Sequence, residues 1–341
     1  MGHVGVIVNP WAGKDVRRLH APSGHTSDTT KIAIVRRIVV AAVDCGAVRV
    51  HLARDASQIA ARAIAGLDDS VTEHVSLIDG PGTGSALDTR RAAAQLADIG
   101  CDVVVVLGGD GTCRDVAIGW PDVAMIAIST GTNNVFPSAI DATSAGTAAG
   151  LVANGSVAVG RVAAAAKRLH VRVTTGAGVE VIDAALVDVA LIAGSVVGAR
   201  AVLHGSAVQA VVAAIATPTS TGLSSIAGRL RPLGRHEPGA VAVRLGGNAR
   251  RIRVPLVPGS ADVLAVDSVE DLADGDSFHL HGPGVLAYDG ERERVLTDTA
   301  TAVVTVGHDG PRVIDVNCTL QYAARRRLFD IAPIREDSHG S

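Results

Sequence analysis

The residues best suited to catalysis lie in one stretch, Val103 to Asp115, which reads VVVVLGGDGTCRD. A run of strand-forming residues ends there at small residues around Asp110, namely Gly108, Gly109, Gly111 and Thr112. Glycines let backbone approach a phosphate closely, and the start of a following helix offers free N–H groups and a positive dipole end. Asp110 could hold Mg²⁺ or take a proton from an attacking hydroxyl. The competing interpretation is an ordinary strand-to-helix turn in which Asp110 only caps the helix.

Two more polar loops follow apolar strands. Residues 4–8 lead into NPWAGK, which begins at Asn9, and residues 123–128 lead into STGTNNVFP. The second loop supplies four candidate nucleotide-binding residues, Gly131, Thr132, Asn133 and Asn134. Loops at the carboxyl ends of adjacent parallel strands can form two sides of one nucleotide crevice, and amide side chains suit ribose and adenine edges. Both loops could instead be ordinary turns or helix N-caps.

The elements that must position these loops alternate along the first half of the chain. Strands are predicted at residues 4–8, 48–52, 75–78, 103–107 and 123–128, and helices at 31–46, 56–67 and 89–99. The alternation predicts βαβ units and an α/β, Rossmann-like nucleotide-binding domain over residues 1–160. The fully apolar run at 103–107 is typical of a central parallel strand covered on both faces. The glycine-containing loop at 81–85 is assigned no chemistry.

After about residue 160 the helical signals fade. Short β-rich segments, punctuated by glycine and proline, follow at residues 169–174, 179–182, 186–192, 208–215, 241–245, 252–256 and 263–266. They predict a second, mostly antiparallel, β-sandwich-like substrate domain over residues 161–300. The most apolar zone, 184–216, is interrupted by charged residues, so it predicts strands and a buried helix rather than a membrane span.

Three features of this second domain could contribute to a site. Asp188 lies inside the apolar run ALVDVAL, where an acid needs a partner or a function unless it faces outward. Residues 217–225, TPTSTGLSS, carry six hydroxyls that could line a polar substrate site or form a surface loop. The candidates among them are Thr217, Thr219, Ser220 and Ser224. The Asp-Gly pair within YDGERE, residues 288–293, is a leading hairpin signal.

Composition excludes several classes of protein. Apolar residues make up 48% of the 341-residue chain and aromatics 2%, so large cores must be built from aliphatic side chains. The net charge of −3 and the lack of a basic patch with interleaved aromatics argue against nucleic-acid binding. The four cysteines have no metal-site spacing, which fits a reducing cytosol, and the N-terminus lacks a signal-peptide pattern. We therefore expect a cytoplasmic protein.

The GGDGT stretch after an apolar strand resembles the signature of the superfamily that joins NAD kinases with diacylglycerol and sphingosine kinases. NPWAG resembles the NPxxG of the lipid kinases, which meets the nucleotide phosphates in those enzymes, and GTNN is similar to their GTGND. ALVDVAL resembles the ALNEVV or ALNDVV of NAD kinases, whose Asn and acid contact the bound dinucleotide. Asp188 matches the acid, and Val187 replaces the Asn.

Two further segments extend the resemblance into the second half. TPTSTGLSS is similar to the TPTGSTAYS of NAD kinases, which frames the substrate, but Leu223 stands near the place of its aromatic. Asp289 and Glu291 match an Asp-Gly-Glu of the lipid kinases, whose acids serve the phosphate-transfer site. GTNNVFP, ALVDVAL, GLSSIAG and YDGERE together look most like the ATP-NAD kinase-like proteins of the acetoin catabolism protein X type.

This resemblance implies a fold and an activity. The fold is an α/β nucleotide domain and a β-rich second domain with the active cleft between them, and a C-terminal segment, 301–341, that packs on the first domain. The activity is Mg²⁺-dependent phosphoryl transfer from ATP to a hydroxyl, with the 2′-hydroxyl of NAD as the leading acceptor and NADP as the product. Another small-molecule or lipid hydroxyl is the alternative, as is a non-catalytic nucleotide-binding protein of acetoin catabolism.

The resemblance also implies roles for individual residues. Asp110, Asp289 and Glu291 would be catalytic. The nucleotide would be bound by Asn9, Gly108, Gly109, Gly111, Thr112, Gly131, Thr132, Asn133 and Asn134. The substrate would be bound by Asp188, Thr217, Thr219, Ser220 and Ser224. Metal ligands are not assigned, and the donor, ATP or polyphosphate, is left open. The expected partners are a small molecule such as NAD and, in a homo-oligomer, further copies of the chain, with neither nucleic acid nor a membrane span.

Overall fold

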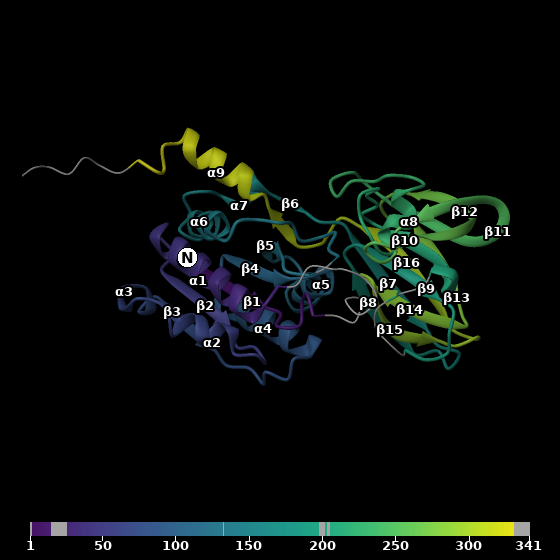
Figure 1. The fold of residues 1–341 in the computed structure, drawn as a ribbon, viewed down its shortest axis with the longest axis horizontal. Coiled ribbons are helices and arrows are strands. Elements are labelled where there is room, and N and C mark those ends of the chain that lie inside the picture. Colours follow the sequence, from purple (N-terminus) through teal and green to yellow (C-terminus); the bar gives the residue numbers. More distant parts are fainter. Residues whose placement is uncertain (1, 15–25, 132, 198–201, 203–204, 331–341) are drawn as a thin grey trace, which may run out of the picture.

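The computed structural model describes residues 2–14, 26–131, 133–197, 202 and 205–330. Two parts of the chain lie side by side, a helix-covered sheet and a region made mostly of strands (Figure 1). No helix within the described ranges is long and apolar enough to cross a bilayer.

The first part is built on a seven-stranded sheet in the order β3-β2-β1-β4-β5-β17-β6. Its strands are β1 (His3–Val8), β2 (Arg49–Ala53), β3 (Val75–Ile78), β4 (Val103–Gly108), β5 (Ala124–Ser129), β6 (Ala163–Ala165) and β17 (Arg312–Ile314). All neighbours pair in parallel except β17 and β6, which are antiparallel. The predicted α/β domain with a parallel sheet is confirmed.

Helices cover both faces of this sheet. They are α1 (Asp28–Asp44), α2 (Ile59–Ile64), α3 (Asp69–Thr72), α4 (Ala86–Ile99), α5 (Asp110–Gly119), α6 (Ala142–Ala153), α7 (Val159–Val162) and α9 (Val316–Arg325). On β4, Val103, Val105 and Leu107 pack in the core with α1, α2 and α6, whereas Val104 and Val106 pack in the core with α4 and α5. The strand is buried on both faces because its side chains alternate between two helical layers.

The second part is a sandwich of two antiparallel sheets. One has six strands in the order β12-β11-β10-β9-β14-β15, and the other has four in the order β13-β16-β7-β8. The six are β9 (Asp188–Ile192), β10 (Val208–Ala213), β11 (Ala240–Val254), β12 (Asp262–Leu272), β14 (Gly284–Tyr288) and β15 (Glu291–Leu296). The four are β7 (Arg168–Thr174), β8 (Glu180–Ala185), β13 (Ser277–His281) and β16 (Thr301–Gly307). Side chains of both sheets share one core, and α8 (Ser224–Gly228) covers the other face of the larger sheet.

Three details differ from the sequence-based expectations. Within the described part of 184–216 the only helical turn is a short 3₁₀ segment, Gly205–Ala207, because strands β9 and β10 take up most of the apolar residues. The predicted strands at 241–245 and 252–256 are two halves of β11, whose register against β12 shifts between Leu245 and Arg250.

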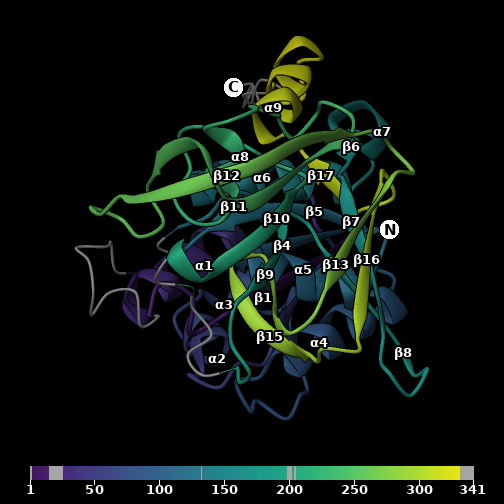
Figure 2. The same ribbon diagram turned by 90° about the vertical axis from the view of Figure 1, so that its right-hand side faces the viewer.

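The C-terminal segment also begins later than expected. β16 pairs with β7 and β13, so residues 301–307 belong to the sandwich, and the return to the first sheet starts after Gly307. β17 then enters between β5 and β6, and α9 packs beside α6. Figure 2 shows the sandwich in front and α9 at the upper edge of the molecule.

Candidate functional site

The loops after β1 and β4 are joined at the carboxyl edge of the first sheet. Asn9 donates its backbone N–H to the Leu107 carbonyl at 2.9 Å, and its Nδ2 donates to Thr112 Oγ1 at 2.8 Å. Thr112 folds back over the end of β4, where a Cβ on Gly108 would lie 2.4 Å from the Thr112 Cβ. Glycine is therefore required at 108 for this turn, and Asn9 lies beside the GGDGT stretch.

Asp110 is the first residue of α5 and is buried. Its Oδ1 accepts backbone N–H bonds from Val135 at 3.0 Å and Phe136 at 2.8 Å. These donors lie in the loop after β5, so Asp110 holds that loop against residues 108–112, which we call the glycine turn. Its role is thus more than capping its own helix.

The loop after β5 also contacts the sandwich. Asn134 Nδ2 donates to Ser129 Oγ at 2.7 Å and so stiffens the loop, while Asn133 Oδ1 accepts a hydrogen bond from the hydroxyl of Thr221. Arg235, which the sequence did not single out, donates from Nη2 to the carbonyls of Val135 and Phe136 at 3.0 and 2.6 Å. Thr132 lies outside the described residues.

These loops surround a cavity of about 650 Å³. The predicted residues that line it are Asn9, Gly109, Asp110, Gly111, Thr112, Gly131, Asn133, Asn134, Asp289 and Glu291. Gly84 and Ser85 of the 81–85 loop line it too, although no role was predicted for that loop. The cavity has the position expected of a nucleotide site, beyond the carboxyl ends of parallel strands.

A second, smaller cavity adjoins the first on the sandwich side. It is lined by Asp188, Ser224, Thr221, Leu223, Leu256 and Val202, among others. Asp110 and Asp289 line both cavities, so they lie at the junction between them. The remaining predicted substrate residues, Thr217, Thr219 and Ser220, line neither; the Ser220 hydroxyl donates to the Thr217 carbonyl at 2.7 Å within its own loop.

Asp289 occupies the turn between β14 and β15 with φ of 48°. Its Oδ1 accepts backbone N–H bonds from Leu186, Val187 and Asp188 at 3.1, 2.8 and 3.2 Å. Burial raises the pKa of Asp289 to about 7, against the opposing effect of the Arg114 guanidinium. The predicted turn exists, and its carboxylate holds the segment that presents Asp188.

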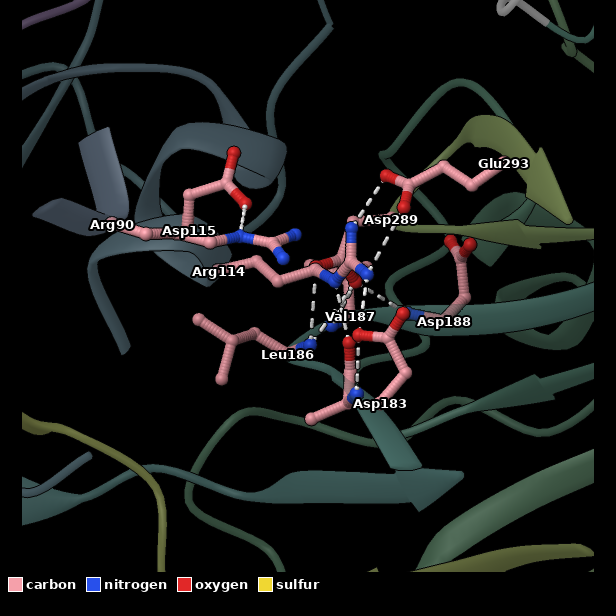
Figure 3. Close-up of polar contacts among 10 residues, drawn as sticks. Arg90, Arg114, Asp115, Asp183, Leu186, Val187, Asp188, Asp289 and Glu293 are labelled. Carbon is pink, nitrogen blue, oxygen red and sulfur yellow. Dashed lines mark hydrogen bonds and ion pairs between the residues drawn. The ribbon is translucent and has the colours of Figure 1, made fainter. Parts of the chain in front are cut away.

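Arg114 anchors the same region and was not foreseen. It is buried in α5, forms ion pairs with Asp183 at 2.7 Å and Glu293 at 2.5 Å, and donates from Nε to the Ala184 carbonyl at 2.5 Å (Figure 3). Its guanidinium also lies 4.7 Å from the centroid of the Tyr288 ring. The only sequence signal was an arginine placed next to buried positions one turn after Asp110, and its partners come from distant strands.

Glu291 begins β15 and faces the glycine turn. A Cβ on Gly111 would lie 3.9 Å from its carboxyl carbon. Asp115, one residue beyond Arg114, also lines the larger cavity, and burial raises its pKa to about 6 although Arg90 is 2.8 Å away. The described residues contain no group of three or more His, Cys, Asp or Glu side chains that could hold a metal ion.

Comparison with known proteins covers almost the whole chain. Residues 4–157 match the family model of the ATP-NAD kinase N-terminal domain, and residues 167–309 match that of the acetoin catabolism protein X C-terminal domain. Acetoin catabolism protein X of Cupriavidus necator is 34% identical over 339 residues, which is 97% of this chain and 94% of that protein.

Solved structures align with most of this chain at low sequence identity. Yeast NADH kinase complexed with NADH has a TM-score of 0.55 at 15% identity, over 97% of this chain and 88% of that one. A diacylglycerol kinase of Bacillus anthracis has a TM-score of 0.40 at 14% identity, over 92% of this chain and 96% of that one. The likeness to the NADH kinase is one of fold.

Proposed function

The chain belongs to the ATP-NAD kinase-like family that includes acetoin catabolism protein X, and we propose that it transfers a phosphoryl group from ATP to a hydroxyl, with the 2′-hydroxyl of NAD as the leading acceptor. The observation that carries this proposal is the position of Asp110, at the junction of the larger and the smaller cavity. A donor in one cavity and an acceptor in the other would bring the reacting atoms together beside its carboxylate.

The larger cavity suits the nucleotide donor. The glycine turn after β4 and the N-terminus of α5 offer backbone N–H groups to phosphate oxygens, and the Asn9–Thr112 contact fixes the adjoining loop. The smaller cavity, which Asp188 and Ser224 line, measures about 20 Å³ and would admit only the reacting hydroxyl group of the acceptor.

In the proposed reaction the acceptor oxygen attacks the γ-phosphorus and the bond from that phosphorus to the β–γ bridging oxygen breaks, so that ADP leaves. Asp110 accepts the hydroxyl proton, and its orientation is set by the N–H groups of Val135 and Phe136. Such reactions depend mainly on positioning and charge neutralisation. Asp289 adds a second carboxyl group at the junction.

A Mg²⁺ ion would supply charge neutralisation on the transferred phosphate. Mg²⁺ is commonly held by one or two carboxylates together with substrate phosphates. The described residues fit that pattern, because Glu291 offers a carboxylate at the cavity wall while Asp110 takes the hydroxyl proton. The phosphates of ATP would therefore provide most of the ligands.

One observation favours a different acceptor. The smaller cavity is lined by four aliphatic residues, Val135, Val202, Leu223 and Leu256, and Leu223 stands near the place of an aromatic in NAD kinases. A hydroxyl compound, either a small molecule or a lipid, that is apolar next to its reacting hydroxyl would suit such walls. We propose it as the second candidate.

The test is an assay for NADP after incubation with Mg²⁺, ATP and NAD, and with polyphosphate as a second donor. We expect NADP from the wild type and at least about a hundredfold less from Asp110→Asn, because general-base catalysis contributes roughly 10²–10⁴-fold. Asn can keep the two N–H bonds that reach Oδ1, so the variant should retain the fold, which circular dichroism checks.

Different outcomes separate the candidates. Unchanged turnover in Asp110→Asn would remove Asp110 from the mechanism. ATP binding without NADP, followed by phosphorylation of another hydroxyl compound, would support the second candidate. No transfer to any acceptor, despite nucleotide binding, would indicate a binding protein that does not catalyse phosphoryl transfer.

A further inference from the structure

Trp11 is an unusually placed aromatic side chain. The chain has two Trp, two Tyr and three Phe residues, and most of the described ones are buried or half-buried. Trp11 instead has 54% of its surface exposed and lines the larger cavity. A large exposed aromatic at the wall of a concave polar site is typical of a surface that binds a flat ring.

The indole rests on a loop that is shaped to receive it. A Cβ on Gly84 would lie 2.5 Å from Trp11 Nε1, so a side chain at this position would displace the indole from its place against the loop. Asp88 holds the Gly84 loop from α4, because its carboxylate accepts the Gly84 N–H at 2.7 Å and the Thr83 hydroxyl at 3.0 Å. The backbone N–H of Trp11 donates to Asn9 Oδ1 at 2.8 Å. Both sides of the contact are therefore fixed by hydrogen bonds.

We infer that Trp11 stacks on the nucleobase of the phosphoryl donor. This inference rests on the proposed function, since it requires that the larger cavity binds a nucleotide. Trp11 lines that cavity and not the smaller one, which assigns it to the donor rather than the acceptor. Asn9, two residues earlier, contacts Thr112 in the glycine turn, so one short loop reaches both the phosphate end and the base end of a nucleotide.

The charges around the indole also suit a base. Lys14 Nζ lies 5.7 Å from the centroid of the ring and is paired with Asp28 at 2.5 Å, so its charge is already partly neutralised. Arg54, Ser85 and Thr89 line the same cavity and could hydrogen-bond to the edges of a base or ribose. The stack would give affinity for any purine nucleotide, because every base has a flat π-face.

The experiment compares a ligand with a base and one without. Calorimetric titration of the full chain with Mg²⁺-ATP and with inorganic tripolyphosphate would be repeated on Trp11→Ala and Trp11→Phe. We expect Trp11→Ala to weaken ATP binding about tenfold and to leave tripolyphosphate binding unchanged, since stacking acts only on the base. Trp11→Phe, which keeps a flat ring, should restore most of the affinity.

Fluorescence gives an independent measurement. Trp120 is the other tryptophan, so Trp120→Phe leaves Trp11 as the single indole in the chain. ATP should quench its emission, and tripolyphosphate should not.

The outcomes distinguish this inference from the proposed function. If ATP binds the wild type and Trp11→Ala equally well, or if Trp11→Ala weakens ATP and tripolyphosphate alike, the stacking role is wrong while the nucleotide site stands. If the wild type binds neither ligand, both the stacking role and the proposed kinase are wrong.

Discussion

Asp110 and Asp289 share one arrangement, a buried carboxylate that accepts backbone N–H bonds from a neighbouring loop. Asp110 binds the loop after β5, and Asp289 binds the segment between β8 and β9. Each acid therefore shapes the wall of the site as well as facing it. A substitution that keeps one oxygen in place can separate these two roles, because Asn preserves the acceptor but cannot ionise.

Asp289→Asn tests the ionisation of this buried acid. Its folded-state pKa of about 7 lies above the ordinary value of 3.8, so the folded protein binds a proton that the unfolded chain releases between about pH 4 and 7. This contribution to the free energy of unfolding is fully present below pH 4 and is lost as the pH rises through 7, with a slope of at most about 1.4 kcal/mol per pH unit.

We therefore expect the unfolding free energy of the wild type minus that of Asp289→Asn to fall between pH 4 and 7. Urea titrations of both proteins at intervals of half a pH unit measure this difference. A difference that stays flat, or that rises with pH, would contradict the raised pKa.

At the scale of elements, α5 connects the two parts of the molecule. Its first turn carries Gly111 and Thr112 of the glycine turn, and one turn later Arg114 binds β8 through Asp183 and β15 through Glu293. The strand that carries Glu291 is thereby fixed relative to the glycine turn. The position of this carboxyl group depends on an ion-pair cluster that holds the helix to the sandwich.

Removing the buried cation should be costly. Arg114→Met leaves two carboxylates without their common partner, and we expect a loss of about 3–5 kcal/mol in the free energy of unfolding. Arg231→Met is the matched control, because Arg231 and Asp271 form a solvent-exposed pair and should contribute less than about 1 kcal/mol. Urea unfolding at pH 7.5 measures both. Equal losses of unfolding free energy in the two variants would show that the buried cluster stabilises the protein no more than the exposed ion pair does.

The elements were predictable from sequence to different degrees. The valine run of β4 and the alternation before residue 160 predicted the first sheet, because burial on both faces requires continuously apolar strands. The Asn9–Thr112 contact did not follow from this reasoning, because it requires β1 to lie beside β4 and joins residues 103 positions apart. Local pattern was sufficient wherever the partners were neighbouring βα units.

Contacts between the two parts were not predictable in this way. Arg114 meets Glu293 across 179 positions of sequence, and Arg235 meets Phe136 across 99. Residues 217–225 are divided, because Thr221 and Ser224 line the smaller cavity whereas Ser220 bonds within its own loop. Hydroxyl content does not reveal which way a side chain points.

At the scale of the whole molecule, the sandwich is an insertion into the first part. The chain leaves the first sheet after β6 and returns to it at β17, and β6 and β17 are direct neighbours. The two ends of the insertion also meet, because Arg168 and Gly307 are register partners on β7 and β16. All strands of the first sheet lie outside the inserted residues.

This topology predicts that the first part folds without the insertion. We expect a chain in which a short Gly-Ser linker replaces residues 168–307 to unfold cooperatively in urea, with a lower free energy of unfolding than the full chain. Domain insertions are tolerated when the two ends of the insertion lie close together, because the host chain can then be joined without distortion. The lower stability follows from lost apolar packing, because Phe136 shares a core with Leu186, Val187 and Ile215, which the shortened chain lacks.

The same shortened chain separates binding from chemistry. It keeps Gly109, Asp110 and Thr112 but loses Asp188 and Asp289 together with the smaller cavity. Calorimetry should therefore detect tripolyphosphate binding, while the NADP assay should detect no product. Failure to fold would mean that the first sheet depends on the sandwich, and retained transfer would place the acceptor site wholly within the first part.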